Sequence, residues 1–416
     1  MLAPDHPVVL KAWDRLHSLG AISDDAGRLT RSFLSPASRR AAEQILAWME
    51  ETGLSTAHDA LGNLRGRHEG RGSRPPLLIG SHYDTVVDAG KFDGPLGIIS
   101  GMAAIELLAS QGRSPEESVD ILAFADEEGV RFHATYLGSR ACIGELDEAL
   151  LGTRDARGIT VAEAIAHEGW HEGASEIVYP PGSASAYLEL HIEQGRVLEN
   201  ASLALGVVPS ICGQVRGRIE LRGQAEHAGT TPMPLRRDAL AGAAECVLAI
   251  EGIAKLHDPL VATVGKLDVW PGAGNSVPGE CHFTLDVRHP SDGQLEDALK
   301  AIERACREIA GSRRLEIVFE ILQRGAAVQA DDAWVATLAA AVAEVTGSPA
   351  PRIPSGAGHD AVVMSAVAPM AMIFLRCRAG LSHHPDESIT REDLALGIET
   401  LAKVIDRWCN SPYNHS

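Results

Sequence analysis

The first third of the chain alternates short apolar runs with helix-like segments. Residues 37–50 carry apolar side chains at helical spacing, whereas Leu77–Gly80 and Ser118–Ala125 are apolar runs without polar alternation. Such runs predict strands buried on both faces, and the small-residue segment Gly97–Leu108 between them predicts a helix. This order predicts the α/β class, with a mixed, largely parallel sheet flanked by helices.

The pattern changes after residue 211. Strands are predicted at residues 214–222, 260–270, 279–288 and 314–322, and helices at 235–253 and 293–309. This β-α-β-β-α-β order predicts a ferredoxin-like α+β domain. We expect it to be inserted, as residues 212–329, into a larger domain made of residues 1–211 and 330–416, which resumes with a helix at 333–345 and a strand at 371–375.

Composition excludes several classes of function. With 37 Lys and Arg against 56 Asp and Glu, the net charge of −19 disfavours nucleic acid and anionic membranes as partners. The N-terminal residues lack the basic and apolar regions of a signal peptide, and no apolar stretch is long enough to span a bilayer. Seven cysteines without a CxxC pair indicate neither a disulfide framework nor a thiolate zinc site. We therefore expect a cytoplasmic protein.

Polar residues follow the predicted strands. His82 and Asp84 come directly after the first buried strand, on the same face of it, so Asp84 can accept the second ring N–H of His82. Asp93 follows in a glycine-rich loop. Ligands bind beyond the carboxyl ends of strands in open α/β sheets, although a solvated turn is the more common explanation of each residue when it is taken alone.

Three further segments also place polar residues at or after the ends of predicted strands. Asp126-Glu127-Glu128 leaves the second strand, where one carboxylate can bind a metal while its neighbour acts as general base. His191 ends an alternating run, and His383-His384 follows the strand at 371–375. Imidazole and carboxylate without thiolate are the ligands of hydrolytic zinc, manganese or cobalt centres.

These segments carry a family resemblance. The runs GSHYDTV, GKFDGPLG, DEEG, HIEQG, EHAGTTPM, GAGNSVPG, SGAGHDA and SHHPDE occur in the order typical of the M20 metallohydrolase superfamily. The chain more closely resembles the hydantoinase/carbamoylase branch, which includes N-carbamoyl-L-amino-acid hydrolases, β-ureidopropionases and allantoate amidohydrolases. The resemblance extends from about Gly80 to Glu387.

The resemblance implies a site with two divalent metal ions, Zn, Mn or Co, per subunit. It implies these roles: His82 and His191 hold one ion, Glu128 and His383 hold the other, Asp93 bridges both, Glu127 is the general base, and Asp84 supports His82. His384 is the alternative to His383, which we prefer because it follows Ser382 at the family's SHxP position.

The resemblance also implies substrate-binding residues. His227 stabilises the substrate carbonyl, in its own subunit or across a dimer, and Asn275 and Arg288 resemble a carboxylate clamp. Gln194 and the backbone near Gly358 contact substrate, while the role of His359 stays open.

The function implied is hydrolysis of the ureido C–N bond of a small acid, such as allantoate or an N-carbamoyl-L-amino acid, by a metal-bridging water. The inserted domain serves as a lid and dimerisation domain of a homodimer. Aminopeptidase relatives usually carry a carboxylate at the position of His191, so this histidine favours the carbamoyl branch. The alternatives are a di-metal aminopeptidase, an N-acyl amino-acid deacylase, or a non-catalytic dimeric binding protein.

Overall fold

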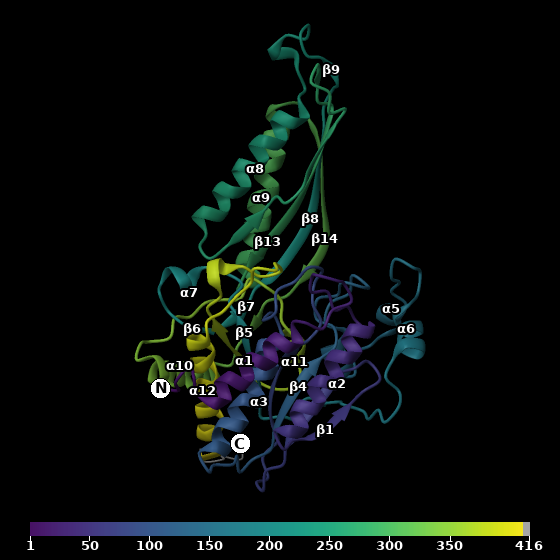
Figure 1. Ribbon diagram of the computed structural model, residues 1–416. Helices are drawn as coiled ribbons and strands as arrows, with labels where there is room; N and C mark the ends of the chain where they lie inside the picture. The colour runs from purple at the N-terminus through teal and green to yellow at the C-terminus, as the bar shows by residue number, and fades with distance from the viewer. Residues whose placement is uncertain (411–416) are drawn as a thin grey trace. The chain divides into compact units, whose positions relative to one another are not determined.

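The computed structural model describes residues 1–410, which form two compact units (Figure 1). Unit 1 comprises Met1–Pro209, Ala330–Ile353 and Gly358–Ser416, and unit 2 comprises Ser210–Gln329 and Pro354–Ala357. The short segment at 354–357, expected in the larger domain, falls in unit 2. Ser355 N–H donates to Ser210 O and Ser355 O accepts from Cys212 N–H, so backbone hydrogen bonds hold this segment beside residues 210–212.

A seven-stranded sheet lies at the centre of unit 1. Its strand order is β1-β2-β4-β3-β5-β16-β6. The strands are β1 (Ser55–His58), β2 (Leu64–His68), β3 (Leu77–His82), β4 (Val119–Phe124), β5 (Ala186–Ile192), β6 (Leu205–Val208) and β16 (Met370–Leu375). The four central strands β4, β3, β5 and β16 are parallel, but β1, β2 and β6 pair antiparallel. The sheet is therefore mixed, and the expectation of a largely parallel sheet holds only at its centre.

Helices cover this sheet and place its apolar face in the core. They are α1 (Pro7–Leu19), α2 (Pro36–Glu51), α3 (Pro95–Ser110), α4 (Leu137–Cys142), α5 (Glu148–Leu151), α6 (Val161–Glu168), α7 (Val197–Asn200), α10 (Asp332–Thr346), α11 (Ala361–Met364), α12 (Arg391–Asn410) and the 3-10 turn η2 (Arg378–Gly380). Helix α3 packs on β3 and β5 and contacts α1 and α12. Because strand side chains alternate, Ile79, Ile121 and Leu188 enter this core while Glu189 and His191 face the opposite side.

Unit 2 is built on a five-stranded antiparallel sheet with order β10-β13-β8-β14, in which β11 also pairs with β13. Its elements are β7 (Ser210–Ile211), β8 (Gly213–Arg222), β9 (Glu226–His227), η1 (Met233–Leu235), α8 (Ala239–Leu256), β10 (Val261–Thr263), β11 (Leu267–Trp270), β12 (Ser276–Val277), β13 (Glu280–His289), α9 (Asp292–Ser312), β14 (Glu316–Gly325) and β15 (Val328–Gln329). Figure 1 shows α8 and α9 side by side along this sheet, where they enclose a separate apolar core.

Two predicted elements of unit 2 differ from the structure. The single strand expected at 260–270 is two strands, because the side chain of Thr284 accepts Lys266 N–H and interrupts the backbone ladder. The helix expected from residue 235 begins at Ala239, since the carboxylate of Asp238 caps it by accepting Ala241 N–H.

No helix within residues 1–410 combines the length and apolar character that a membrane span requires. All seven cysteines are free thiols.

Glycine at position 97 sets the distance between α3 and the sheet. A β-carbon there would lie 2.6 Å from Leu190 O. We predict that Gly97→Ala lowers the free energy of unfolding by about 1–3 kcal/mol, because the helix must shift away from β5. Gly252→Ala in α8, where a β-carbon meets no atom within 4 Å, is the matched control. Gly252→Ala should raise the free energy of unfolding by up to about 1 kcal/mol. Urea unfolding of both variants checks this, and equal stabilisation by both would contradict the close approach.

Candidate metal centre

The parallel central strands bring four sequence segments to one edge of the sheet. His82 is the last residue of β3, and His191 is the second-last of β5. Glu127 and Glu128 follow the end of β4, and the loop after β16 carries His383. Because parallel strands end at the same edge, residues that lie up to 301 positions apart in the chain, His82 and His383, meet there.

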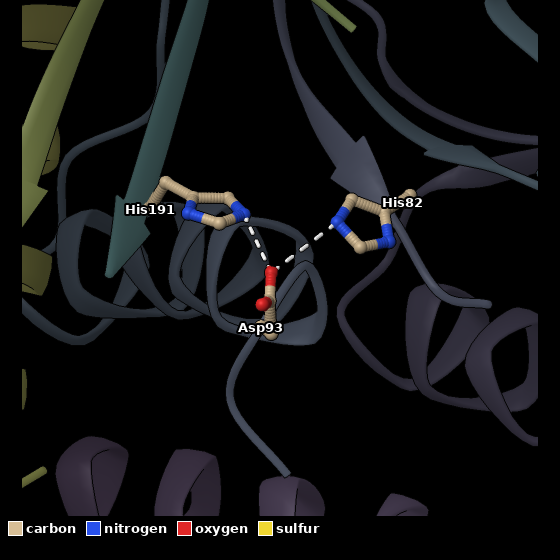
Figure 2. Close-up of side chains that lie close together, drawn as sticks. All are labelled: His82, Asp93 and His191. Carbon is tan, nitrogen blue, oxygen red and sulfur yellow. Dashed lines mark ion pairs between the residues drawn. The ribbon is translucent and has the colours of Figure 1, made fainter. Parts of the chain in front are cut away.

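Asp93 lies at the centre of the site, in the loop that leads into α3. Figure 2 shows the imidazoles of His82 and His191 pointing toward its carboxylate from two different strands. The Nε2 atoms of these histidines lie 3.6 Å and 3.1 Å, respectively, from Asp93 Oδ1. The following residue, Gly94, has φ of 84° and a β-carbon there would lie 2.5 Å from the His82 ring. Only glycine therefore allows the loop to pass this close to His82.

The second oxygen of Asp93 faces another pair of side chains. His383 Nε2 lies 3.4 Å from Asp93 Oδ2 and 3.2 Å from Glu128 Oε1. Two groups of ligand-type atoms, His82 with His191 and Glu128 with His383, thus share Asp93. His384 instead pairs with Asp386 and does not belong to either group. Of the two adjacent histidines, the structure brings His383 to the site.

Asp84 connects the first histidine to the carboxylate segment. Its Oδ1 lies 3.3 Å from His82 Nδ1, and its two oxygens accept the N–H groups of Glu127 and Glu128 at 3.0 and 3.2 Å. His191 Nδ1 lies 2.9 Å from Ile192 O. Both ring Nδ1 atoms have an acceptor beside them, which leaves the Nε2 atoms to face Asp93.

The charges at this edge match the requirements of divalent cations. His191 Nε2 is buried and forms no hydrogen bond within residues 1–410, although it lies 3.1 Å from Asp93 Oδ1. These two atoms, His191 Nε2 and Asp93 Oδ1, lie close together but are not aligned for a hydrogen bond. This is expected of two ligands that converge on one ion. Asp126 and Asp360 add buried carboxylate to the same region. A buried excess of negative charge is stable only with a cation or with protons, and this imidazole–carboxylate set suits zinc, manganese or cobalt.

The ionisation of these groups follows from burial and from their neighbours. Burial opposes ionisation of Asp93, but His191, His383 and His82 hold its pKa well below the usual range. Contacts with Asp93 and Glu128 raise the pKa of His383 to about 10. Burial raises the pKa of Glu127 well above its ordinary value, against the opposing charge of His82. Burial also raises the pKa of Asp126 and Asp360, so Glu127 is one of several carboxyl groups in this region that are suited to take up a proton.

Gln194 lies beside Asp93, within the candidate metal centre. Its Nε2 donates to Asp93 Oδ2 at 2.8 Å and to Ser382 Oγ at 3.2 Å, and Ser382 donates to the same carboxylate oxygen. Gln194 and His383 both adopt positive φ. Strained backbone of this kind persists where the surrounding contacts fix it.

His359 and Gly358 lie beside the first group of ligands. The His359 ring packs edge-on against His191 with ring centroids 4.5 Å apart, and it is buried. Burial and the neighbouring His191 lower the pKa of His359 well below the usual range, so the ring is neutral. Gly358 contacts the side chain of Tyr136.

The predicted substrate residues of unit 2 lie at two ends of its sheet. His227 is exposed and pairs with Ser276 in the β9–β12 ladder. In the next residue, Ala228 N–H donates to Asn275 O. β9 lies beyond one end of the sheet in Figure 1, whereas Arg288 lies eight residues along β13 from Glu280, at the other end. At about 3.3 Å per residue this separation is about 26 Å. Asn275 and Arg288 of one chain are thus too far apart to hold the same small carboxylate, and the predicted clamp stays a prediction for residues of two copies.

Arg288 already has a fixed orientation. Its Nε and Nη2 donate to the two carboxylate oxygens of Asp286 at 2.8 and 2.9 Å, and its Nη1 donates to Gly356 O at 2.6 Å. The Nε/Nη2 fork of the guanidinium is thus paired with the carboxylate of Asp286 in this structure.

Two supporting residues were not predicted. Glu387 Oε1 accepts the N–H groups of Phe92 and Asp93 at 2.7 and 3.1 Å, which joins the His383 loop to the Asp93 loop. Its position within the SHHPDE run was the available signal. Arg31 is fully buried, and its guanidinium donates to Tyr83 O, between His82 and Asp84. The sequence around Arg31 gives no indication of this contact.

Known proteins resemble this chain over nearly its whole length. The family model described as Peptidase family M20/M25/M40 matches residues 78–407. Allantoate deiminase of Arabidopsis thaliana is 40% identical over 431 residues, which cover 95% of this chain and 82% of that protein. N-carbamoyl-L-amino acid amidohydrolase of Geobacillus stearothermophilus is 40% identical over 398 residues, which cover 95% of this chain and 97% of that protein.

A solved structure agrees with these sequence matches. The amidase of the hydantoinase/carbamoylase family from Burkholderia multivorans superposes with a TM-score of 0.89 at 34% identity, and the match covers 97% of this chain and 98% of that one. The order of motifs, the mixed sheet and the extent of these matches lead to one conclusion. The chain belongs to peptidase family M20/M25/M40 and, within it, to the hydantoinase/carbamoylase branch.

Proposed function

We propose that this protein is a metal-dependent amidohydrolase that cleaves the ureido C–N bond of a small acid. The single observation that carries the proposal is the shared carboxylate of Asp93, whose Oδ1 faces His82 and His191 while its Oδ2 faces His383. A carboxylate placed between two ligand sets is the arrangement that bridges two cations in di-metal hydrolases. Relatives named allantoate deiminase and N-carbamoyl-L-amino acid amidohydrolase, each 40% identical, support ureido acids as the substrate class.

The ligand assignment follows these contacts. His82, His191 and Asp93 would hold one divalent ion, and Asp93, Glu128 and His383 would hold the other. Bound zinc, manganese or cobalt ions would polarise the ureido carbonyl and make water a stronger nucleophile at neutral pH. A ureido carbonyl needs this help because both of its nitrogens donate electrons into it.

Glu127 supplies the proton transfer. Its carboxylate takes the proton of the attacking water and passes it to the leaving nitrogen, a role that its burial and raised pKa favour. Asp84 keeps His82 oriented and holds the backbone of Glu127 in place through Glu127 N–H. Gln194 and the Gly358 backbone contact the substrate from unit 1.

Unit 2 supplies the remaining substrate contacts in this proposal and acts as a lid and dimerisation domain. The separation within unit 2 supports a proposal in which Arg288 and the pair His227 and Asn275 of one chain serve different sites. We therefore assign Arg288 to the substrate carboxylate in its own chain. His227 and Asn275 reach the site of a second copy, where His227 stabilises the developing negative charge on the carbonyl oxygen.

Glu127→Gln separates proton transfer from metal binding. We predict that it lowers kcat by about 10²–10⁴-fold, because the amide cannot accept a proton, while the metal content per chain stays that of the wild type. Glu128→Gln, the same change one residue later, should lower metal content instead. Ammonia release from allantoate and N-carbamoyl-L-amino acids measures the rate, and elemental mass spectrometry measures the metal.

Full activity of Glu127→Gln would remove Glu127 from the role of base. Turnover of dipeptides or acetylated amino acids, with none of ureido acids, would instead favour an aminopeptidase or deacylase. A wild-type protein without metal or activity would favour a binding protein.

A mixed dimer tests the exchange of His227 between chains. One chain carries Glu127→Gln and the other carries His227→Ala, with different tags so that only mixed dimers are purified. Each parent dimer should lose about 10²-fold or more in kcat. In the mixed dimer one site combines an intact Glu127 with an intact His227 from the other chain, so we predict about half of the wild-type rate. A mixed dimer as inactive as its parents, or a monomer on purification, would contradict the exchange.

A further inference from the structure

Tyr136 is held beside Glu127 by the loop that connects β4 to α4. Its backbone N–H donates to Glu127 O at 3.1 Å, so the loop turns back on itself. The residue has φ of 68° and ψ of 26°, a left-handed conformation that is unfavourable for a tyrosine. Such strain persists only where the surrounding structure fixes it, often at functional sites.

The phenol of Tyr136 reaches the backbone of Gly358. A β-carbon at position 358 would lie 1.8 Å from Tyr136 Oη and 3.1 Å from Cζ. Any side chain at position 358 would therefore displace the hydroxyl. The hydroxyl lies between Gly358, which we assign to substrate contact, and the loop of the proposed general base.

This hydroxyl differs from those of three other tyrosines. Those of Tyr83, Tyr179 and Tyr187 donate to Gly62 O, Asp120 Oδ2 and Glu189 Oε2, respectively. Within residues 1–410 the Tyr136 hydroxyl has no hydrogen-bond partner, and its side chain is only partly exposed. Burial raises the pKa of Tyr136 well above its usual value and the charge of Glu127 raises it further, so the phenol is a neutral donor. The hydroxyl is therefore a donor that is free to pair with water or with a ligand.

We propose that Tyr136 Oη is a specificity-determining group that hydrogen-bonds a polar substituent on the α-carbon of the substrate. It thereby favours ureido acids that carry a second polar group, such as the second ureido group of allantoate, over N-carbamoyl amino acids with apolar side chains. This inference rests on the proposed ureido-acid hydrolysis. An apolar substituent against the phenol would displace water and leave the hydroxyl unpaired, and sites built around a hydrogen bond discriminate strongly for this reason.

The test compares kcat/KM for allantoate with that for N-carbamoyl-L-leucine. Tyr136→Phe should lower the ratio of the two by about ten- to a hundredfold, through a loss on allantoate, because it removes only the hydroxyl. Tyr179→Phe makes the same change at a hydroxyl bound to Asp120 and should leave the ratio unchanged. Gly358→Ala should lower the ratio in the same direction by displacing the hydroxyl, and it should add little in a Tyr136→Phe background.

An unchanged ratio in Tyr136→Phe, with both substrates turned over by the wild type, would overturn the inference and leave the proposed function intact. An equal loss on both substrates would also overturn it, since Tyr136 would then serve the reacting centre or the fold. If the wild type released ammonia from neither substrate, the proposed function itself would fail.

Discussion

The site depends on one buried carboxylate. Asp93 holds histidines from β3, from β5 and from the loop after β16 around its two oxygens, and it receives a further hydrogen bond from Gln194. A carboxylate this buried needs compensating positive charge or donors. Asp93 is therefore where segments remote in the chain must meet, and the glycine that follows it allows the close approach to His82.

The sheet supplies the rigidity that this arrangement needs. Strand alternation sends Leu188 and Leu190 into the apolar core while Glu189 and His191 face the opposite side of the same strand. Ser81 and Tyr187 donate to Glu189, so the polar side of the sheet is tied across strands as well as packed. Side chains on strands fixed in this way are pre-organised, which lowers the ordering cost of binding an ion.

Much of unit 1 follows from the sequence because its signals are local. Apolar runs mark the buried strands. His82 and His191 lie within the last two positions of β3 and β5, and Glu128 and His383 lie in the loops after β4 and β16, where the parallel pairing must gather them. Glu387 and Arg31 were missed because their roles are contacts with backbone atoms far away in the chain, which no local pattern records. The motifs also could not show that Asn275 and Arg288 lie at opposite ends of one sheet, since a motif gives residue types but not the length of the strand between them.

The central claim is that Asp93 bridges two divalent cations. Crystals of the full chain grown with Mn²⁺ and measured near the manganese absorption edge test it most directly, because anomalous differences locate the ions independently of activity. The account predicts two peaks about 3.5–4 Å apart, one on each side of the Asp93 carboxylate, the first near His82 and His191 and the second near Glu128 and His383. A single peak, or two peaks away from Asp93, would contradict it.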